Sequence, residues 1–349
     1  MSRNLNVLHI MSHFYTTSVY KSILSATTAC NVNSTIFSPV YDRNNNRYND
    51  AHHAPSLYLK YHKLFYKLKL RKAVTYLRKN LSETQFDHLH AHTLFSDGAL
   101  AYEVNKLGFN LNYTVTVRDT DLNVFLKYKP YLKPYGKKVL EGADNIICLN
   151  VPYKQQVQQI FDISSKRISV VPNILPDFWG NGEVRTKGGS GRFIFVGKNI
   201  PRKNLDAVVR SFLVLKKKYP HVVLSLVGDD AFSKFAQVDD AIISYGKVDK
   251  KTLKSLYQQS DCLVLPSLTE TFGMVYLEAL SQGLSIIHSK NQGVDGYFND
   301  NSQCIAVDPK SDTEIISAME TLMQLVPSEI NLSDFSSRSV ADQLISLYK

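Results

Sequence analysis

Short apolar runs recur along the whole chain, each rich in Val, Ile, Leu or an aromatic residue. The stretches between them are long enough for a helix, which is the pattern of β-α-β units and a parallel sheet. In the first half the runs are Asn6 to Met11, Thr35 to Ser38, Asp87 to Ala91, Tyr113 to Val117, Asn145 to Leu149 and Ile168 to Val171. In the second half they are Phe193 to Val196, Val222 to Val227, Ile242 to Tyr245, Cys262 to Leu265, Ser285 to His288 and Cys304 to Val307. We therefore predict an α/β fold with doubly wound parallel sheets.

Amphipathic patterns occupy several of the intervening stretches. Between Asn204 and Lys218 the apolar residues fall on one helical stripe, and a second helical pattern runs from Lys251 to Gln259. Near the end, Ser337 to Tyr348 carries apolar residues at helical spacing and predicts a closing helix.

The alternation stops between Pro172 and Arg192, where Pro, Gly and polar residues concentrate. Such a segment is typical of a linker between domains. We predict two Rossmann-like domains, residues 1–178 and 179–331, followed by the closing helix in residues 332–349.

The composition indicates the size of the core, the charge of the partner and the cellular compartment. With 349 residues, 44% of them hydrophobic, the chain can bury a large core, and its net charge of +10 favours an anionic partner. The four cysteines are far apart and resemble reduced core residues, which favours a reducing compartment. No apolar run reaches the length of a membrane-spanning helix or of a secretory signal, so we expect a cytoplasmic protein.

The loop after Cys262 to Leu265 carries the strongest candidate chemistry. Glu270 precedes a predicted helix whose start, Phe272-Gly273-Met274-Val275, includes a glycine that lets a ligand approach the backbone. Free amides at Gly273, Met274 and Val275 would face an anion such as a diphosphate. Glu278, inside the helix, is able to accept hydrogen bonds from sugar hydroxyls, as is Glu270. The alternative without a ligand is that Glu270 only caps the helix and Glu278 is solvated.

Two other loops follow strands of the same domain. The first begins at Gly197 and contains the cations Lys198, Arg202 and Lys203, which could neutralise a phosphate or remain solvated. In the second, around Lys247 and Val248, backbone groups could contact a nucleobase. Together these loops predict a site for a sugar linked to a diphosphate.

With these residues assembled, the second half resembles the donor domain of retaining glycosyltransferases of family 4, which have the GT-B fold of two domains facing a cleft. Glu270 and Glu278 match the family's Glu-x7-Glu motif. The resemblance implies that Glu270 contacts the donor sugar, Glu278 the ribose and Lys203 the diphosphate. It also implies that residues 1–178 bind the acceptor, that residues 179–331 bind the donor, and that the closing helix returns to the first domain.

The acceptor side departs from the family pattern. The first loop, Met11–Thr17, lacks the usual Gly-Gly turn and offers His13 as a candidate. Many members place a His where this chain has Arg118-Asp119, so Arg118 or Asp119 is expected to orient the acceptor or a phosphate, and both join Glu270 and Lys203 as catalytic candidates. Asp119-Thr-Asp121 resembles the metal-binding motif of an unrelated fold, but we interpret it as a polar loop.

The implied reaction moves a sugar from a UDP- or GDP-sugar to a hydroxyl of a lipid-linked glycan in bacterial-type polysaccharide, lipopolysaccharide or capsule synthesis, with retention at the anomeric carbon. No metal or other cofactor is expected, because Lys residues and helix amides can stabilise the leaving group. The alternatives are a GT-B phosphorylase or epimerase, and a non-catalytic polyanion-binding protein. No nucleic-acid motif is present in the sequence, and no nucleic-acid partner is expected.

One basic stretch stands outside this site. Residues 58–79 contain eight Lys or Arg, no acid, and interleaved Leu and aromatic residues. Such a helix is able to rest on an anionic membrane surface, or it packs its apolar residues into the domain and leaves the cations solvated. The first possibility predicts a peripheral protein on the inner face of the cytoplasmic membrane.

Overall fold

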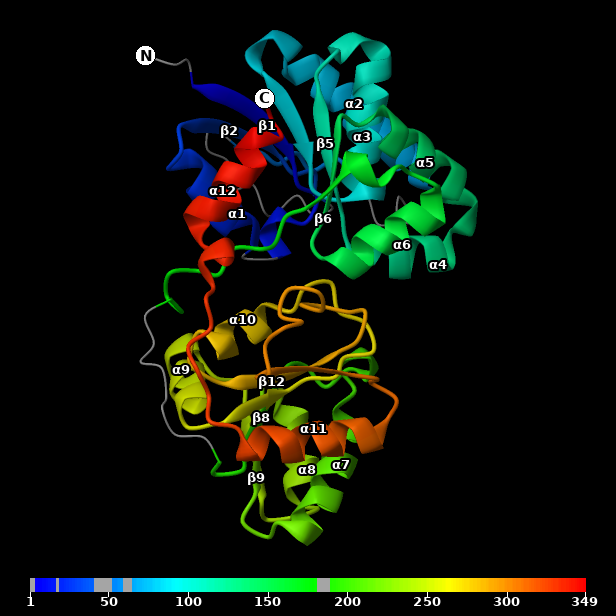
Figure 1. Ribbon diagram of the computed structural model, residues 1–349. Helices are drawn as coiled ribbons and strands as arrows, with labels where there is room; N and C mark the ends of the chain where they lie inside the picture. The colour runs from blue at the N-terminus through cyan, green and yellow to red at the C-terminus, as the bar shows by residue number, and fades with distance from the viewer. Residues whose placement is uncertain (1–3, 17–18, 41–51, 59–64, 181–188) are drawn as a thin grey trace. The chain divides into compact units, whose positions relative to one another are not determined.

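The structure is a computed structural model, and it describes residues 4–16, 19–40, 52–58, 65–180 and 189–349. It divides into two compact units (Figure 1). Unit 1 comprises Met1–Ile174 with Ser337–Lys349, and unit 2 comprises Leu175–Ser336. Parts of the predicted linker and of the basic stretch, residues 181–188 and 59–64, lie outside the described residues.

A parallel sheet of seven strands forms the centre of unit 1, in the order β3-β2-β1-β4-β5-β6-β7. The strands are β1 (Leu5–Ile10), β2 (Val32–Phe37), β3 (His52–His53), β4 (His88–Ala91), β5 (Tyr113–Val117), β6 (Asn145–Cys148) and β7 (Ile168–Val170). The central strands β4 and β5 are buried throughout, as expected for strands covered on both faces.

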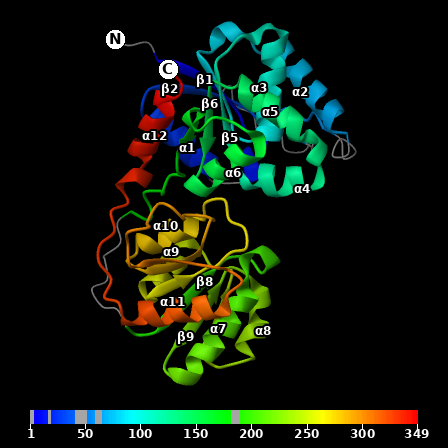
Figure 2. The ribbon, with the colours of Figure 1, turned by 45° about the vertical axis from the view of Figure 1, so that its right-hand side comes forward.

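Helices cover this sheet. They are α1 (Val19–Thr28), α2 (Tyr66–Asn80), α3 (Ala99–Val104), α4 (Leu126–Tyr128), α5 (Lys133–Gly142), α6 (Val151–Phe161) and α12 (Ser337–Ser346). The last of these, α12, lies beside α1 in both views (Figures 1 and 2). It buries Val340, Ala341 and Leu344 in an apolar cluster with Val7 of β1 and Ile23 of α1. The C-terminal helix is thus part of the core of unit 1.

Unit 2 contains a parallel sheet of six strands in the order β10-β9-β8-β11-β12-β13. The strands are β8 (Arg192–Val196), β9 (Val223–Val227), β10 (Ile242–Gly246), β11 (Cys262–Val264), β12 (Ser285–Ser289) and β13 (Cys304–Val307). The helices are α7 (Leu205–Lys218), α8 (Ser233–Ala236), α9 (Lys250–Gln258), α10 (Met274–Leu280) and α11 (Asp312–Gln324). Helices α7 and α11 lie side by side (Figure 2).

The predicted α/β class with two doubly wound sheets is confirmed. Each of the twelve apolar runs overlaps an observed strand. Two strands differ from the predicted runs by more than one residue: β3 was not predicted, and β2 begins at Val32 instead of Thr35. In β2, Asn33 and Ser34 interrupt the apolar run, yet these residues pair with Asn6 and Val7 of β1.

The units divide after residues 174 and 336, whereas the sequence predicted boundaries after residues 178 and 331. Leu175 donates its amide to the carbonyl of Phe335 at 2.8 Å. Trp179 is fully buried, and its carbonyl accepts from Gln282 Nε2 at 2.8 Å. These contacts attach the residues just after Ile174 to unit 2.

Candidate functional site

Each sheet has one position where the strand order reverses. In unit 2 it lies between β8 and β11, and in unit 1 between β1 and β4. Loops that leave the carboxyl ends of two such strands diverge, and doubly wound sheets bind ligands there. Most of the residues predicted as the donor site follow β8 and β11, whereas Lys247 and Val248 follow the edge strand β10. On the acceptor side, His13 follows β1.

The reversal point of unit 2 brings Glu270 and Lys203 together. Both side chains are largely buried, and the Lys203 ammonium forms an ion pair with Glu270 Oε2. Arg202 Nη1 lies 3.7 Å from the same oxygen and donates to the carbonyl of Thr269 at 3.2 Å. A carboxylate and two cations from separate loops therefore meet at one point, and they can bind hydroxyl and phosphate groups of one ligand.

The backbone of Glu270 is fixed from the other side. Its amide donates to Gln292 Oε1 at 2.9 Å, and its carbonyl accepts from the amide of Gly293 at 2.9 Å. Gln292 was missed by sequence reasoning. The signal that could have revealed it is its position in the loop directly after β12, the strand next to β11.

Gly273 begins helix α10 with φ of +77°. A Cβ at this position would clash with the ring of Tyr276, so the site requires glycine. The following amides belong to the first turn of α10, where they lack intrahelical acceptors. Phe272 is buried, while Gly273, Met274 and Val275 are partly exposed, so the backbone here is accessible to a ligand.

Glu278 has different surroundings. Burial raises the pKa of its carboxyl to about 7, although Lys250 and the hydroxyl of Tyr257, both in α9, act to lower it. Glu270 and Glu278 thus occupy separate environments and face different neighbours. The use of each acid for a different part of a ligand stays a prediction.

The remaining donor-side candidates lie around the ends of β8, β9 and β10. Gly197 donates its amide to Val227, and Gly228 donates to Gly246. Asn199 and Ala231 amides, aided by the nearby charges of Lys247 and Lys198, lower the pKa of Asp229. Lys198 and Lys247 are exposed and Val248 is half-buried. Lys198 and Lys247 are the basic side chains of this group, and Gly197 adjoins Lys203, whose Cδ would lie 3.8 Å from a Cβ at Gly197.

In unit 1, Arg118 follows β5. Its Nε donates to the carbonyl of His92 at 2.9 Å, and its guanidinium lies 5.1 Å from the centre of the Tyr20 ring. His13 lies close enough to Arg118 for the two charges to interact. The sequence-predicted acceptor candidates Arg118 and His13 are therefore neighbours.

Asp119 and Asp121 have internal partners. Asp119 Oδ1 accepts from Asn123 Nδ2 at 2.6 Å and from the Tyr153 hydroxyl at 2.9 Å. The Asp121 carboxylate is buried and accepts the amides of Leu94, Phe95 and Arg118. The Asp-x-Asp sequence thus organises the loops after β4 and β5.

Three buried histidines form the one group of side chains in the described chain that could hold a metal ion. The ligand atoms of His9, His90 and His92 lie within 4.8 Å of one another. However, His9 Nδ1 is 3.1 Å from His92 Nε2, and His90 bonds to the Tyr348 and Thr116 hydroxyls. Burial lowers the pKa of all three rings. The cluster is a neutral hydrogen-bond network that joins the C-terminal Tyr348 to β4.

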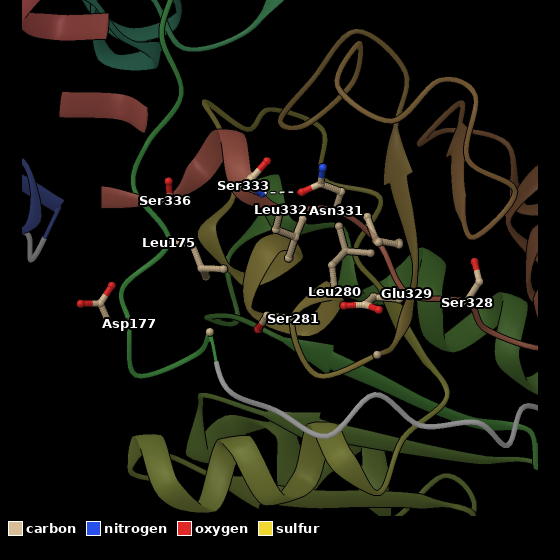
Figure 3. A pocket seen from close by; sticks show the side chains of 13 residues that line it. Leu175, Asp177, Leu280, Ser281, Ser328, Glu329, Asn331, Leu332, Ser333 and Ser336 are labelled. Atoms are coloured by element: carbon tan, nitrogen blue, oxygen red, sulfur yellow. Dashed lines mark hydrogen bonds between the residues drawn. The ribbon is translucent and has the colours of Figure 1, made fainter. Parts of the chain in front are cut away.

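A cavity of about 340 Å³ lies elsewhere in unit 2. Figure 3 shows Leu280 and Ser281, at the end of α10, together with residues of the segments 175–180 and 328–336. Gly273 and the ion pair of Lys203 with Glu270 are at the opposite end of α10. None of the predicted donor-site residues lines this cavity.

Two family models match the chain. "Glycosyl transferases group 1" matches residues 182–334, and "Glycosyltransferase Family 4" matches residues 20–176. The chain belongs to glycosyltransferase family 4. It is a glycosyltransferase, as the sequence predicted. The alternative function of a non-catalytic polyanion-binding protein is therefore set aside.

The chain is also similar to other proteins named as glycosyltransferases. The uncharacterized glycosyltransferase YqgM of Bacillus subtilis is 25% identical over 247 residues, which cover 67% of each chain. The O-antigen chain mannosyltransferase RfbU of Salmonella typhimurium is 22% identical over 244 residues, again 67% of each. The structure of sucrose-phosphate synthase from Thermosynechococcus elongatus superposes with a TM-score of 0.76 at 17% identity, covering 99% of this chain and 98% of that one. The fold is therefore GT-B.

Proposed function

We propose that this enzyme transfers a sugar from a UDP- or GDP-sugar to a hydroxyl of a lipid-linked surface glycan, with retention at the anomeric carbon. The observation that carries the proposal is the buried pair of Lys203 and Glu270 at the reversal point of unit 2, beside the glycine that begins α10. The similarity to an O-antigen chain mannosyltransferase supports a glycan acceptor.

In this proposal Glu270 accepts hydrogen bonds from the donor sugar and Glu278 from the ribose. Lys203, Arg202 and the amides of residues 273–275 hold the diphosphate. Lys203 exchanges part of its contact with Glu270 for a phosphate oxygen when the donor binds. Because these groups stabilise the charge that develops on the leaving diphosphate, we also propose that no metal ion takes part. Transfer should then persist in EDTA, and restoration of a lost activity by Mg²⁺ or Mn²⁺ would contradict this part.

The test of the donor site is a panel of nucleotide sugars with purified full-length protein. At least one UDP- or GDP-sugar should raise the melting temperature, and the shift should shrink in Lys203→Gln but persist in the control Lys216→Gln, whose ammonium is paired with Asp239 away from the site. A panel that leaves the melting temperature unchanged would contradict the proposed function. NMR of the product's anomeric proton then distinguishes retention from inversion.

We propose in addition that the basic stretch of unit 1 contacts an anionic membrane surface. Helix α2 buries Ala73, Val74 and Leu77, which matches the packed alternative for its second half. At its start, Phe65 directly before the helix is 58% exposed and Leu68 in the first turn is 40% exposed. In the described residues no helix is long and apolar enough to cross a bilayer.

A second exposed segment adjoins α2. Lys129 Nζ lies 5.9 Å from the centre of the Tyr66 ring, which places residues 124–131 beside the start of the helix. Tyr128 and Tyr131 in this segment are 71% and 69% exposed. Exposed aromatic rings among lysines are typical of interfacial membrane contacts. The two segments support a peripheral position on the inner face of the cytoplasmic membrane.

A further inference from the structure

The reversal point of unit 1 carries basic side chains from three separate elements. His13 follows β1, Arg118 follows β5, and Lys69 of α2 is near enough to His13 for the two charges to interact. Strand β4 lies between β1 and β5, so the loops that carry His13 and Arg118 leave the same edge of the sheet two strands apart. This is the position where a doubly wound sheet binds its ligand.

Arg118 is held in a fixed orientation. One side of the guanidinium is anchored by the bond from Nε to the carbonyl of His92, and the buried ring of Tyr20 lies 5.1 Å from its centre. Among the described residues, no acceptor pairs with its two terminal nitrogens. A pre-oriented guanidinium with two terminal donors matches the geometry of a phosphate or carboxylate.

The charges of His13 and Lys69 also favour an anionic ligand. Partial removal from water, then the Lys69 ammonium and the Arg118 guanidinium, lower the pKa of His13, while Asp121 opposes them. Burial also lowers the pKa of Lys69, with Lys129 adding to the effect and Asp97 opposing it. These basic groups are crowded together, and an anion bound among them would relieve their repulsion.

The two acids nearby are directed into the protein. Asp97 is fully buried, and its Oδ1 accepts from the amide and hydroxyl of Ser12, which fixes the loop that carries His13. Asp121 is occupied by three backbone amides. Burial raises the pKa of both carboxyls to about 6, which reduces their competition for the cations.

We propose that Arg118, His13 and Lys69 form a binding site for a phosphate group of the acceptor. The proposal rests on the proposed transfer reaction and adds to it that the acceptor is phosphorylated near the sugar that is extended. A prenyl diphosphate and a sugar phosphate are two sources of this group. In both cases Arg118 is the main contact.

Binding of inorganic pyrophosphate tests the site directly. The full-length Lys203→Gln variant weakens the diphosphate site in unit 2, and calorimetry in this background should report the site in unit 1. Adding Arg118→Gln should weaken binding roughly 10- to 100-fold, because a charge-assisted bidentate contact is lost. Arg118→Lys should fall between the two, since it keeps the charge without the fork.

The matched control is Arg338→Gln, an exposed arginine of α12 whose partner is Asp342. It removes the same charge from unit 1 and should leave pyrophosphate binding unchanged. Circular dichroism and thermal unfolding verify that each variant is folded. Equal binding by the Arg118→Gln and Arg338→Gln forms would overturn the proposal. Proton uptake at His13, seen by NMR when pyrophosphate is added, is a readout that a purely structural arginine would not produce.

Geranyl diphosphate, glucose 1-phosphate and neutral geraniol distinguish the sources. Arg118-dependent binding that is tightest for geranyl diphosphate supports a lipid diphosphate, and tightest binding of glucose 1-phosphate supports a sugar phosphate. Binding of geraniol as tight as that of its diphosphate overturns both. Nucleotide-sugar stabilisation of the unmodified protein is measured in parallel. If it persists while Arg118 has no effect, only the phosphate site fails; if it is absent, the proposed function fails independently.

Discussion

At the scale of single residues, the two acids of the Glu-x7-Glu motif differ in physical character. Glu270 is buried against two cations, whereas Glu278 is partly buried beside a tyrosine and feels the charge of one lysine. The motif spacing alone does not reveal this difference. It follows from Lys203 being in the loop after β8 and Tyr257 being in α9, positions that only the fold brings near the acids.

Replacing Glu270 by Gln should lower both activity and stability. Transfer should fall at least about 100-fold because a contact to the donor sugar is lost. Stability should fall by about 1–3 kcal/mol because Lys203 would remain buried without its counter-charge. Glu270→Gln combined with Lys203→Met should recover stability but not activity, and urea unfolding with a transfer assay measures both. Full activity in the single variant would refute the assigned contact.

Glu278 should make donor binding depend on pH. Burial raises the pKa of its carboxyl from 4.5 to about 7, so the group is increasingly protonated as pH falls below 7. Because the carboxylate accepts two hydrogen bonds from ribose hydroxyls better than the acid does, donor affinity should increase between pH 6 and pH 8, roughly as the charged fraction does. Calorimetric titrations across this range measure the effect, and Glu278→Gln should flatten the profile.

Protein stability should show the opposite trend at this residue. A carboxyl whose pKa is raised in the folded state contributes stability at low pH and loses that contribution as pH rises from 4.5 through about 7. Glu278→Gln should therefore be more stable than the unmodified protein at pH 8 and equally stable at pH 4. Asp240 is an exposed acid of unit 2, and the control Asp240→Asn should leave the stability unchanged at pH 8 and at pH 4.

At the scale of elements, local patterns were sufficient for most helices and strands. The apolar runs predicted β11, which is continuously apolar as buried parallel strands usually are. Strands β4 and β5 were also predicted, although each carries two buried polar residues between its apolar ones. The two-residue β3 is too short to have a pattern. The partners of the site were not predictable in this way, since Gln292 is 22 residues from Glu270 and Tyr348 is 258 residues from His90. Such contacts depend on strand order, which periodicity does not encode.

The attachment of the C-terminal helix is testable at Tyr348. Its buried hydroxyl is 2.7 Å from His90 Nδ1, so Tyr348→Phe leaves a buried ring nitrogen without a partner. We expect a loss of about 1–3 kcal/mol in the free energy of unfolding. Tyr131→Phe removes an exposed hydroxyl of the same unit and should change stability by less than about 0.5 kcal/mol. Equal effects in urea unfolding would show that the network around His90 does not hold α12.

At the scale of the whole molecule, the excess of basic residues has two distinct roles in our proposals. Lys203 and Arg202 in unit 2, and Arg118 with Lys69 in unit 1, are directed to phosphate groups of substrates. The exposed cations of α2, which include Lys67, Arg71 and Lys72, instead face solvent and are available to a surface. The two roles differ in their response to salt, because screening acts much more strongly on exposed charges than on buried ones.

Binding to lipid vesicles should depend on the exposed cations of α2 and not on the cations of the substrate sites. Each exposed cation near an anionic surface contributes about 1 kcal/mol, so changing Lys67, Arg71 and Lys72 to Gln should weaken co-sedimentation with anionic vesicles roughly 100-fold at low salt. Phe65→Ser with Leu68→Ser should weaken it further, because both side chains are exposed and apolar. The pair Val214→Ser and Val238→Ser removes exposed apolar side chains from unit 2 and should have no effect.

Donor binding in these α2 variants should stay unchanged, since none of the changed residues contacts Glu270 or Lys203. Neutral vesicles and 0.5 M salt should both abolish sedimentation of the unmodified protein, because the Debye length falls to about 4 Å. Binding that is equal on neutral and anionic vesicles would contradict a membrane role for α2. The cations of this helix would then only keep its exposed face solvated, and the acceptor would have to reach Arg118 without help from the lipid surface.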